Sequence, residues 1–253
     1  MPNDVAAIAD LLIEAHRQGR QIASPPPGIA PRTREEAFAI QDRVRAALGG
    51  AGGWKTGAPG PEVLPIAAPL LTSLIGPSRA VLPASRFHAI GVEAELAFRF
   101  ARALPRRGEP YSQDEVADAV ASLHVSIEVV DSRLGAWAQD DHMWTLADNQ
   151  INGYFVHGPA VIDWRGQDLE HAPVELLIDG KVAVAHDNDG NPAGDPMRVV
   201  TWLVNHLAET REGLQAGAIV TSGSCTGLIW VEPDVQIVVR FPGIGEAAAH
   251  FPT

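Results

Sequence analysis

Two glutamates stand two residues apart in an apolar stretch of this chain. Glu93 and Glu95 alternate with apolar residues in the segment Gly91–Phe98. Side chains alternate faces along a strand, so both carboxylates would project from the same side, about 7 Å apart. Two such carboxylates repel each other unless one is protonated or a cation lies between them. Burial of the pair therefore favours a bound divalent ion. The alternative is a solvated face of an edge strand.

A third acid strengthens the metal hypothesis. Glu128 stands among β-branched neighbours in the apolar segment His124–Asp131. Three carboxylates plus waters make an oxygen-only site, which suits Mg²⁺ or Mn²⁺ rather than zinc or copper. Asp131 would face the other way on a regular strand, and we expect it to pair with Arg133.

The elements that must position these acids follow from periodicity and turn residues. Helices are predicted over residues 5–15 and 33–48, the second opened by a capping box from Thr33 to Glu36. Residues 51–90 read as irregular, with one strand near 53–56. Strands are then predicted over 92–100, 123–131, 153–161, 174–178, 182–186, 218–221 and 235–241, and helices over 113–121 and 197–210.

Two turns complete this prediction of the elements. Asp179-Gly180 indicates a type I′ hairpin, and residues 187–191 read as a further hairpin turn. The chain is therefore expected to be α+β. Residues 1–50 would form a helical N-terminal segment, and residues 51–253 a β-rich catalytic domain.

Composition excludes several classes of function. The 253 residues carry 19 basic and 31 acidic side chains, a net charge of −12, which disfavours nucleic-acid binding. The single cysteine, Cys225, excludes an intramolecular disulfide and a cysteine-based zinc site, and reads as a packing residue. No apolar run is long enough to span a membrane, and the first residues lack the features of a signal peptide. We expect a cytoplasmic protein without membrane partners.

Several motifs, in order over roughly residues 50–245, resemble the fumarylacetoacetate hydrolase superfamily, especially its 2-keto-4-pentenoate hydratase and 4-oxalocrotonate decarboxylase branch. The motifs are residues 53–57 (GWKTG), 92–98 (VEAELAF), 127–133 (IEVVDSR), 147–149 (ADN), 153–156 (GYFV), 202–207 (WLVNHL), 214–217 (LQAG) and 221–228 (TSGSCTGL).

This resemblance implies a mixed β-roll or sandwich that cradles one Mg²⁺ or Mn²⁺ ion. It places the metal carboxylates on Glu93, Glu95 and Glu128, the active-site lysine on Lys55, and a glycine-bounded loop on 222–224. It also implies a metal-dependent hydro-lyase in the catabolism of aromatic compounds. Such an enzyme adds water to a 2-hydroxy-2,4-dienoate, the enol of a 2-keto-4-enoate. A homo-oligomer is expected, with a related decarboxylase as a further partner.

Each residue outside the metal site also has a plainer interpretation. Burial of Lys55 would either lower its pKa or aim its charge at the substrate carboxylate, whereas a surface lysine on a turn would do neither. Ser222 and Ser224 would line a loop whose amides approach an anionic substrate, or an ordinary turn. Asn149 would bind a substrate oxygen or cap a turn. The outer pocket is expected near Trp137, Trp144 or Leu71.

One departure from the family pattern keeps other activities open. Hydratases of this family usually carry an acid between the lysine and the first glutamates, but residues 56–92 hold only Glu62. The superfamily's hydrolases use a His-Glu pair there, and His88 is the one histidine in that segment. The alternatives are a decarboxylase, a carbon–carbon hydrolase of acylpyruvates, and a non-catalytic keto-acid-binding protein.

Overall fold

Two long antiparallel strands organise the fold of the computed structural model, which describes residues 2–188 and 190–253. Strands β5 (Ile90–Phe100) and β7 (Val120–Val130) pair over nearly their whole length, and Glu93 lies opposite Glu128. The apolar residues of β5 alternate with these acids, so one face of the strand pair packs in the core and the other carries the carboxylates.

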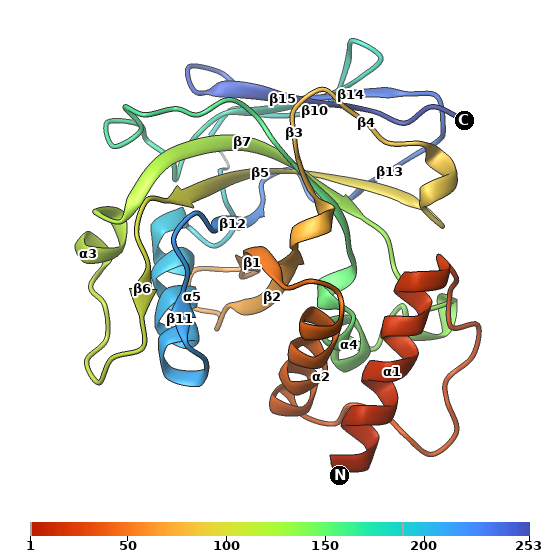
Figure 1. The fold of residues 1–253 in the computed structure, drawn as a ribbon. Helices are drawn as coiled ribbons and strands as arrows, with labels where there is room; N and C mark the ends of the chain where they lie inside the picture. The colour runs from red at the N-terminus through yellow and green to blue at the C-terminus, as the bar shows by residue number, and fades with distance from the viewer. Residues whose placement is uncertain (1, 189) are drawn as a thin grey trace.

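The large sheet has eight strands in the order β2-β1-β12-β5-β7-β8-β3, with β13 paired to β5. Its other strands are β1 (Ala51–Gly57), β2 (Ile66–Leu71), β3 (Ile75–Pro77), β8 (Asn152–His157), β12 (Ile219–Ser224) and β13 (Ile229–Val231). The sheet curls, so that β1 and β2 lie beneath the arch of β5 and β7 (Figure 1). This curvature brings β1 toward the carboxylate-bearing face.

A second sheet of five strands covers the other face of β5 and β7 (Figure 1). It consists of β10 (Lys181–His186), β9 (Val174–Ile178), β14 (Gln236–Phe241), β15 (Gly245–His250) and β4 (Ala80–Val81). Phe98, Ile127, Leu176 and Val239 are buried in the core between the sheets. A short ladder joins β6 (Leu104–Pro105) to β11 (Gly213–Leu214).

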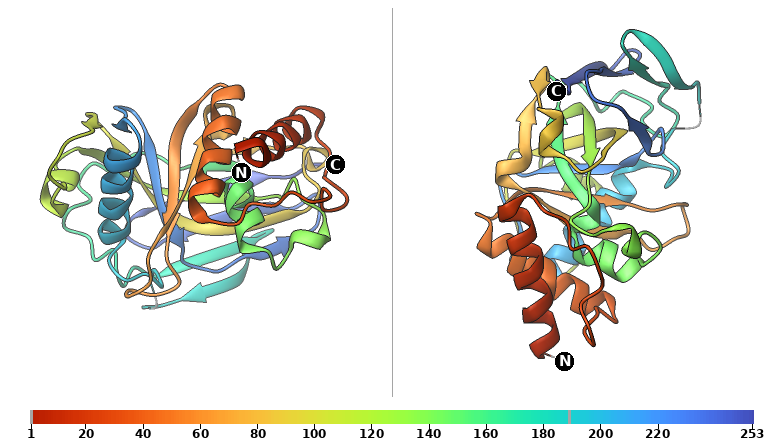
Figure 2. Two further views of the ribbon diagram at one scale, coloured as in Figure 1. Left: turned by 90° about the horizontal axis from the view of Figure 1, so that it is seen from below. Right: turned by 90° about the vertical axis from the view of Figure 1, so that its right-hand side faces the viewer.

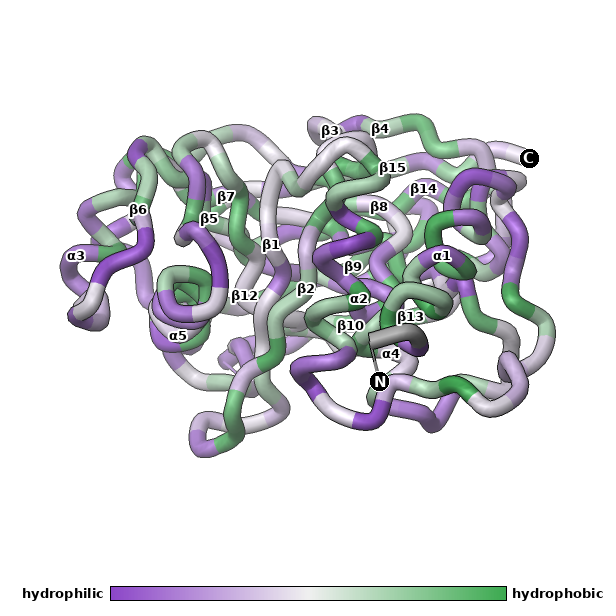
Figure 3. Tube along the Cα trace, turned by 60° about the horizontal axis from the view of Figure 1, so that its bottom comes forward, coloured by the Kyte–Doolittle hydropathy of each residue, from purple (hydrophilic) through white to green (hydrophobic). Residues whose placement is uncertain are grey.

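The helices gather on the other side of the large sheet from the second sheet (Figures 1 and 2). Helices α1 (Pro2–Gln18), α2 (Arg34–Ala47) and α4 (His142–Ala147) share one core that includes Leu12, Ile40 and Trp144. Helix α5 (Pro196–Thr210) packs on β12 and β1, and α3 (Gln113–Ala117) is short. Both hydrophobic and hydrophilic residues occur along these helices, as amphipathic packing requires (Figure 3).

Single turns of 3-10 helix connect several elements. They are η1 (Thr72–Leu74), η2 (Ala84–Arg86), η3 (Ala136–Ala138) and η4 (Asn149–Ile151). Thr33 caps α2 by accepting a hydrogen bond from the Glu36 amide at 3.2 Å, which is one half of the predicted capping box, and the Glu36 carboxylate accepts from the amide of Arg32 at 2.8 Å. Asp179 and Gly180 both have positive φ, 50° and 76°, which confirms the predicted hairpin turn.

The α+β prediction is confirmed, with differences in detail. The one strand predicted in the segment 51–90 is β1, but the segment also contains β2, β3 and β4, which pair with β1, β8 and β15 respectively. The helix predicted over 113–121 ends at Ala117, because β7 begins at Val120 after a short turn. The hairpin predicted at 187–191 is wrong, because this segment leads to α5, whose first turn is capped by Asp195; residue 189 lies outside the described residues. No helix within the described ranges is long and apolar enough to cross a membrane.

Candidate active site

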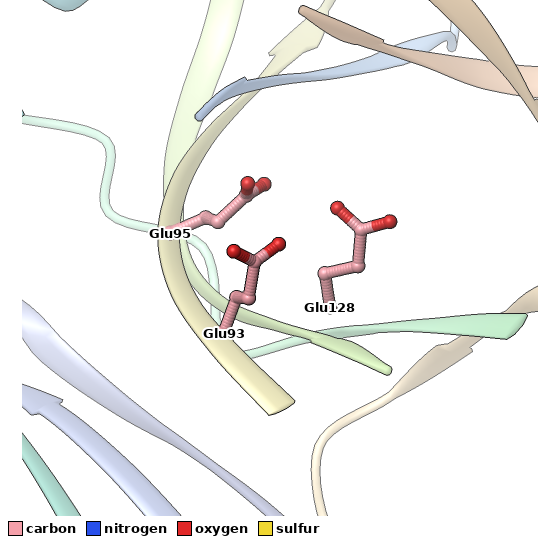
Figure 4. Close-up of side chains that lie close together, drawn as sticks. All are labelled: Glu93, Glu95 and Glu128. Carbon is pink, nitrogen blue, oxygen red and sulfur yellow. The ribbon is translucent and has the colours of Figure 1, made fainter. Parts of the chain in front are cut away.

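The three glutamates selected from the sequence converge in space. Glu93, Glu95 and Glu128 each offer a carboxylate oxygen, and these oxygens lie within 4.8 Å of one another (Figure 4). Glu93 and Glu128 meet because they are directly opposite across β5 and β7. Glu95 is 2% exposed and Glu128 is fully buried, which contradicts the interpretation as a solvated edge strand.

The three carboxylates of this triad lie close together, and two of them have an oxygen without a hydrogen-bond partner among the described residues. Burial, together with the charge of Glu128, raises the pKa of Glu93 and raises that of Glu95 well above its usual value. One oxygen each of Glu95 and Glu128 is buried without a hydrogen-bond partner among residues 2–188 and 190–253. An oxygen-ligated divalent cation would relieve both defects, so the donor set fits Mg²⁺ or Mn²⁺.

Lys55 is the cation that the protein itself brings to the triad. It extends from β1, and its Nζ donates to Glu128 Oε1 and, at 3.2 Å, to the carbonyl of Gln150. Burial alone would lower the pKa of this ammonium, but the three glutamates more than compensate and raise it. The surface-lysine alternative is therefore wrong, since the Lys55 side chain is 12% exposed, and without a metal ion its pKa is raised rather than lowered.

A buried network of hydrogen bonds fixes the side chain of Glu128. Asn152 Nδ2 donates to Glu128 Oε1 at 3.0 Å, and Arg133 Nη1 donates to the carbonyl of Asn152 at 2.6 Å. Arg133 in turn pairs with Asp148, Nε to Oδ1, at 2.7 Å. The predicted pairing of Asp131 with Arg133 is wrong: β7 ends at Val130, and Asp131 instead accepts hydrogen bonds from the 88–89 loop.

The turn between α4 and β8 has an unusual backbone. Asn149, Gln150 and Ile151 have φ values of 51°, 52° and 52°, in the left-handed region. Gln150 thereby turns its carbonyl to Lys55 and lines the cavity beside the triad. Asn149, a predicted substrate contact, is 2% exposed and is not among the residues that line this cavity.

The predicted loop at 222–224 reaches the cavity through its second half. Gly223 and Ser224 line it, whereas the Ser222 hydroxyl donates to the carbonyl of Leu96 at 2.9 Å. Gly223 has φ 98°, and its Cα would lie 3.1 Å from a Cβ placed on Gly57, so both glycines are needed for this close approach. Asn191 fixes the loop, since its Nδ2 donates to the carbonyl of Ser222 at 2.6 Å.

The cavity next to the triad has a volume of about 290 Å³. Its walls come from β1, the start of β2, the turn at Gln150, the loop before α5 and the end of β12. Trp137, Trp144 and Leu71 do not line it: the two tryptophan rings pack edge to face against each other, with their centroids 5.2 Å apart, and Leu71 is buried. The expected outer pocket is therefore wrong in its residues.

Two further candidates lie apart from the cavity. Glu62, the one acid of residues 56–92, is exposed in the turn between β1 and β2 and does not line the cavity. His88 Nδ1 lies 3.1 Å from Asp131 Oδ2, in a different pocket. Burial raises the pKa of the Cys225 thiol to about 12, as suits a packing residue.

Three residues of the site were missed in the sequence. Asn152 directly precedes a predicted strand, so its position was a usable signal. The sequence carried no local signal for Gln150 or Asn191. The position of Gln150 depends on three successive residues with left-handed φ, and that of Asn191 depends on a contact with Ser222, 31 positions away.

Comparison with known proteins agrees with this geometry. The profile of the fumarylacetoacetate (FAA) hydrolase C-terminal family matches residues 58–251. The chain belongs to the fumarylacetoacetate hydrolase family. This confirms the resemblance found in the sequence, and the family match includes Glu93, Glu95 and Glu128 within its range.

Individual members of the fumarylacetoacetate hydrolase family resemble the chain at low identity. The 2-keto-4-pentenoate hydratase of Paraburkholderia xenovorans is 29% identical over 170 residues, which cover 67% of this chain and 62% of that protein, less than two thirds of its length. The 2-keto-4-pentenoate hydratase of Burkholderia vietnamiensis is 28% identical and covers 98% of both chains. The structure of 4-oxalocrotonate decarboxylase from Pseudomonas putida G7, complexed with magnesium and adipate, superposes with a TM-score of 0.85 at 25% identity, over 99% of this chain and 98% of that one.

Proposed function

We propose that this protein is a divalent-metal-dependent hydro-lyase that adds water to a 2-hydroxy-2,4-dienoate in the catabolism of aromatic compounds. The observation that carries the proposal is the buried triad of Glu93, Glu95 and Glu128, with Lys55 bonded to one member, beside a cavity of about 290 Å³. The similarity to hydratases named for 2-keto-4-pentenoate supports this substrate class.

The triad would hold Mg²⁺ or Mn²⁺ through its carboxylate oxygens. When bound, the ion supplies Lewis-acid polarisation of a 2-oxo group and stabilises enolate charge. Glu95 and Glu128 each have an oxygen free to serve as a ligand. The charges of these carboxylates are fixed in place by strands rather than loops, so the site is organised before an ion arrives.

Lys55 would fix the position of Glu128 through their ion pair and would also orient the substrate in the cavity. Its ammonium is paired with Glu128, so it would act as a hydrogen-bond donor and a positive charge rather than as a base. Lys55 lines the cavity and would attract the substrate carboxylate there. The titratable residues that line the described cavity are Lys55, Glu93 and Glu95, so a water molecule would carry protons between substrate and solvent.

The glycine-bounded loop would supply the opposite wall. Ser224 offers its hydroxyl to a substrate oxygen, and the absence of a side chain at Gly223 lets a substrate approach the backbone. Ser222 and Asn149 would act indirectly, Ser222 by anchoring the loop to β5 and Asn149 by supporting the turn of Gln150.

Decarboxylation of a 2-keto acid is the second candidate. Two observations favour it: the structural similarity to 4-oxalocrotonate decarboxylase extends over the whole chain, and no acid of residues 56–92 reaches the described cavity to activate water.

An ultraviolet assay with 2-hydroxypenta-2,4-dienoate tests the proposal. Loss of dienol absorbance with formation of 4-hydroxy-2-oxopentanoate should require Mg²⁺ or Mn²⁺. It should fall by at least about 100-fold in Lys55→Met and Glu128→Gln, as expected when a group essential to transition-state stabilisation is removed. The exposed variants Lys181→Met and Glu62→Gln should retain the wild-type rate.

Other outcomes reassign the reaction. Release of CO₂ from 4-oxalocrotonate without dienoate hydration identifies a decarboxylase, and pyruvate formed from an acylpyruvate identifies a hydrolase. Binding of a 2-oxo acid without turnover of any of these compounds identifies a non-catalytic protein. The homo-oligomeric state, the pairing with a decarboxylase and the cytoplasmic location stay predictions; light scattering after size-exclusion chromatography tests the first.

A further inference from the structure

The charged groups of the cavity are concentrated at one place. Of the residues that line it, only Lys55, Glu93 and Glu95 carry charge, and these belong to the triad and its ion pair. The remaining wall is uncharged. It is formed in part by Ala58, Pro59, Ile66, Gln150 and Pro192.

Strand pairing directs one of these neutral residues toward the site. Lys55 of β1 lies opposite Ala68 of β2, and Ile66 lies two residues before Ala68 on the same face. The side chain of Ile66 therefore shares the face from which Lys55 reaches the triad.

Asn191 and Arg198, two polar residues at or behind this wall, already have partners. Both ends of the Asn191 amide are used, Nδ2 by the carbonyl of Ser222 at 2.6 Å and Oδ1 by the amide of Ala193 at 2.9 Å. Arg198 is behind the wall, not in it: its guanidinium donates to the carbonyls of Gly60 and Ala193 at 3.3 and 3.0 Å. Lys55 is held by Glu128.

We propose that this cavity selects 2-oxo acids, and their enols, whose chain beyond the oxo group is uncharged, and rejects acids with a second carboxylate at the far end. The inference rests on the proposed function, in which the 2-oxo carboxylate end binds at the triad. A second carboxylate would lose its hydration against a wall that offers it no cation.

This selectivity bears on the choice between the two candidate reactions. An enzyme that removes a terminal carboxylate must first accept a diacid. A neutral wall therefore favours the hydration of a monocarboxylate dienoate over the decarboxylation of a diacid.

Calorimetry with two acids of equal length tests the inference. The ligands are 2-oxoheptanoate and 2-oxoheptanedioate, titrated into the protein in the presence of Mg²⁺, so that they differ only in the terminal group. The monoacid should bind at least about tenfold more tightly. Equal or tighter binding of the diacid would overturn the inference while leaving the proposed function intact. Binding of neither acid, in protein that still binds Mn²⁺, would overturn the proposed function instead.

A matched pair of variants tests the wall directly. Ile66→Lys places a cation among the neutral residues, and Ile66→Met keeps similar length without the charge. The ratio of diacid to monoacid affinity should rise about tenfold in Ile66→Lys and stay at the wild-type value in Ile66→Met. An unchanged ratio in Ile66→Lys would show that a distal carboxylate does not meet this wall. If Ile66→Lys does not fold, the wild-type comparison still decides the inference.

Discussion

Glu95 shows most directly how a single buried charge depends on a bound ion. It is 2% exposed, its pKa is raised by burial and by Glu128, and one of its oxygens has no partner in the part of the chain that the structure describes. The carboxylate therefore contributes little to the stability of the metal-free protein. It should contribute strongly when a cation is present.

Glu95→Gln separates these two roles. At a Mn²⁺ concentration of 100 times the Kd, the wild type should gain about 2.7 kcal/mol in free energy of unfolding. The variant should gain much less at the same concentration, while its stability in EDTA should equal or exceed that of the wild type because a buried like charge is gone. Calorimetric titration and urea unfolding measure both. Wild-type Mn²⁺ affinity in the variant would contradict a role as ligand.

The turn Asn149–Ile151 has a backbone conformation that costs stability but directs the Gln150 carbonyl to Lys55. Left-handed φ values cost roughly 1–2 kcal/mol per residue with a side chain, and only glycine adopts them freely. Here three such residues follow each other. The strain is balanced by the buried network of Arg133, Asp148 and Asn152 around the turn.

Replacement of Gln150 by glycine and by alanine should reverse the usual order of stability. Glycine normally destabilises an ordered position relative to alanine. At φ 52° we expect Gln150→Gly to be more stable than Gln150→Ala by about 1 kcal/mol in urea unfolding. Both variants should bind a 2-oxo acid more weakly than the wild type. A more stable alanine variant would mean that the turn is not strained in solution.

The ion pair of Arg133 and Asp148 should be the main support of this element. Both side chains are buried, and the guanidinium also donates to the carbonyls of Asp148 and Asn152. Asp148→Asn leaves the arginine charge without its partner, so the free energy of unfolding should fall by about 3–5 kcal/mol. Asp118→Asn, which breaks the exposed pair with Arg165, is the control and should cost less than about 1 kcal/mol. Equal losses in the two variants would contradict the assigned role.

At the scale of the whole molecule, the sequence predicts whatever is encoded locally. The alternation in Val92–Phe98 predicted β5 and the shared face of Glu93 and Glu95, and Asp179-Gly180 predicted a hairpin. Strand β15 was not predicted, because Ala247–Ala249 favour a helix and become a strand only by pairing with β14. The cavity walls at Gln150 and Asn191 also depend on tertiary contacts, so local patterns could not indicate them.

The stability of the whole fold should fall in mild acid, in part through His206. This imidazole stacks on Trp202, and burial, with the charges of Arg211 and Arg34, lowers its pKa to about 4 from 6.5. The neutral form is therefore favoured in the folded state, so its contribution is present above pH 6.5 and is lost as the pH falls from 6.5 toward 4. Between pH 7.5 and 5, His206→Gln should lose less stability than the wild type, whereas His142→Gln, at an exposed position, should follow the wild type. Parallel curves for His206→Gln and the wild type would refute this.

The position of Glu93 directly opposite Glu128 has a consequence for how the protein forms. If β7 slipped by one residue along β5, the Glu128 side chain would move to the opposite face of the sheet, and the three oxygens would no longer meet. A divalent ion can therefore bind tightly only to molecules whose central strands have paired correctly. During refolding such an ion would bind only to the correctly paired molecules. Its binding would therefore shift the equilibrium between the two strand registers toward the native one.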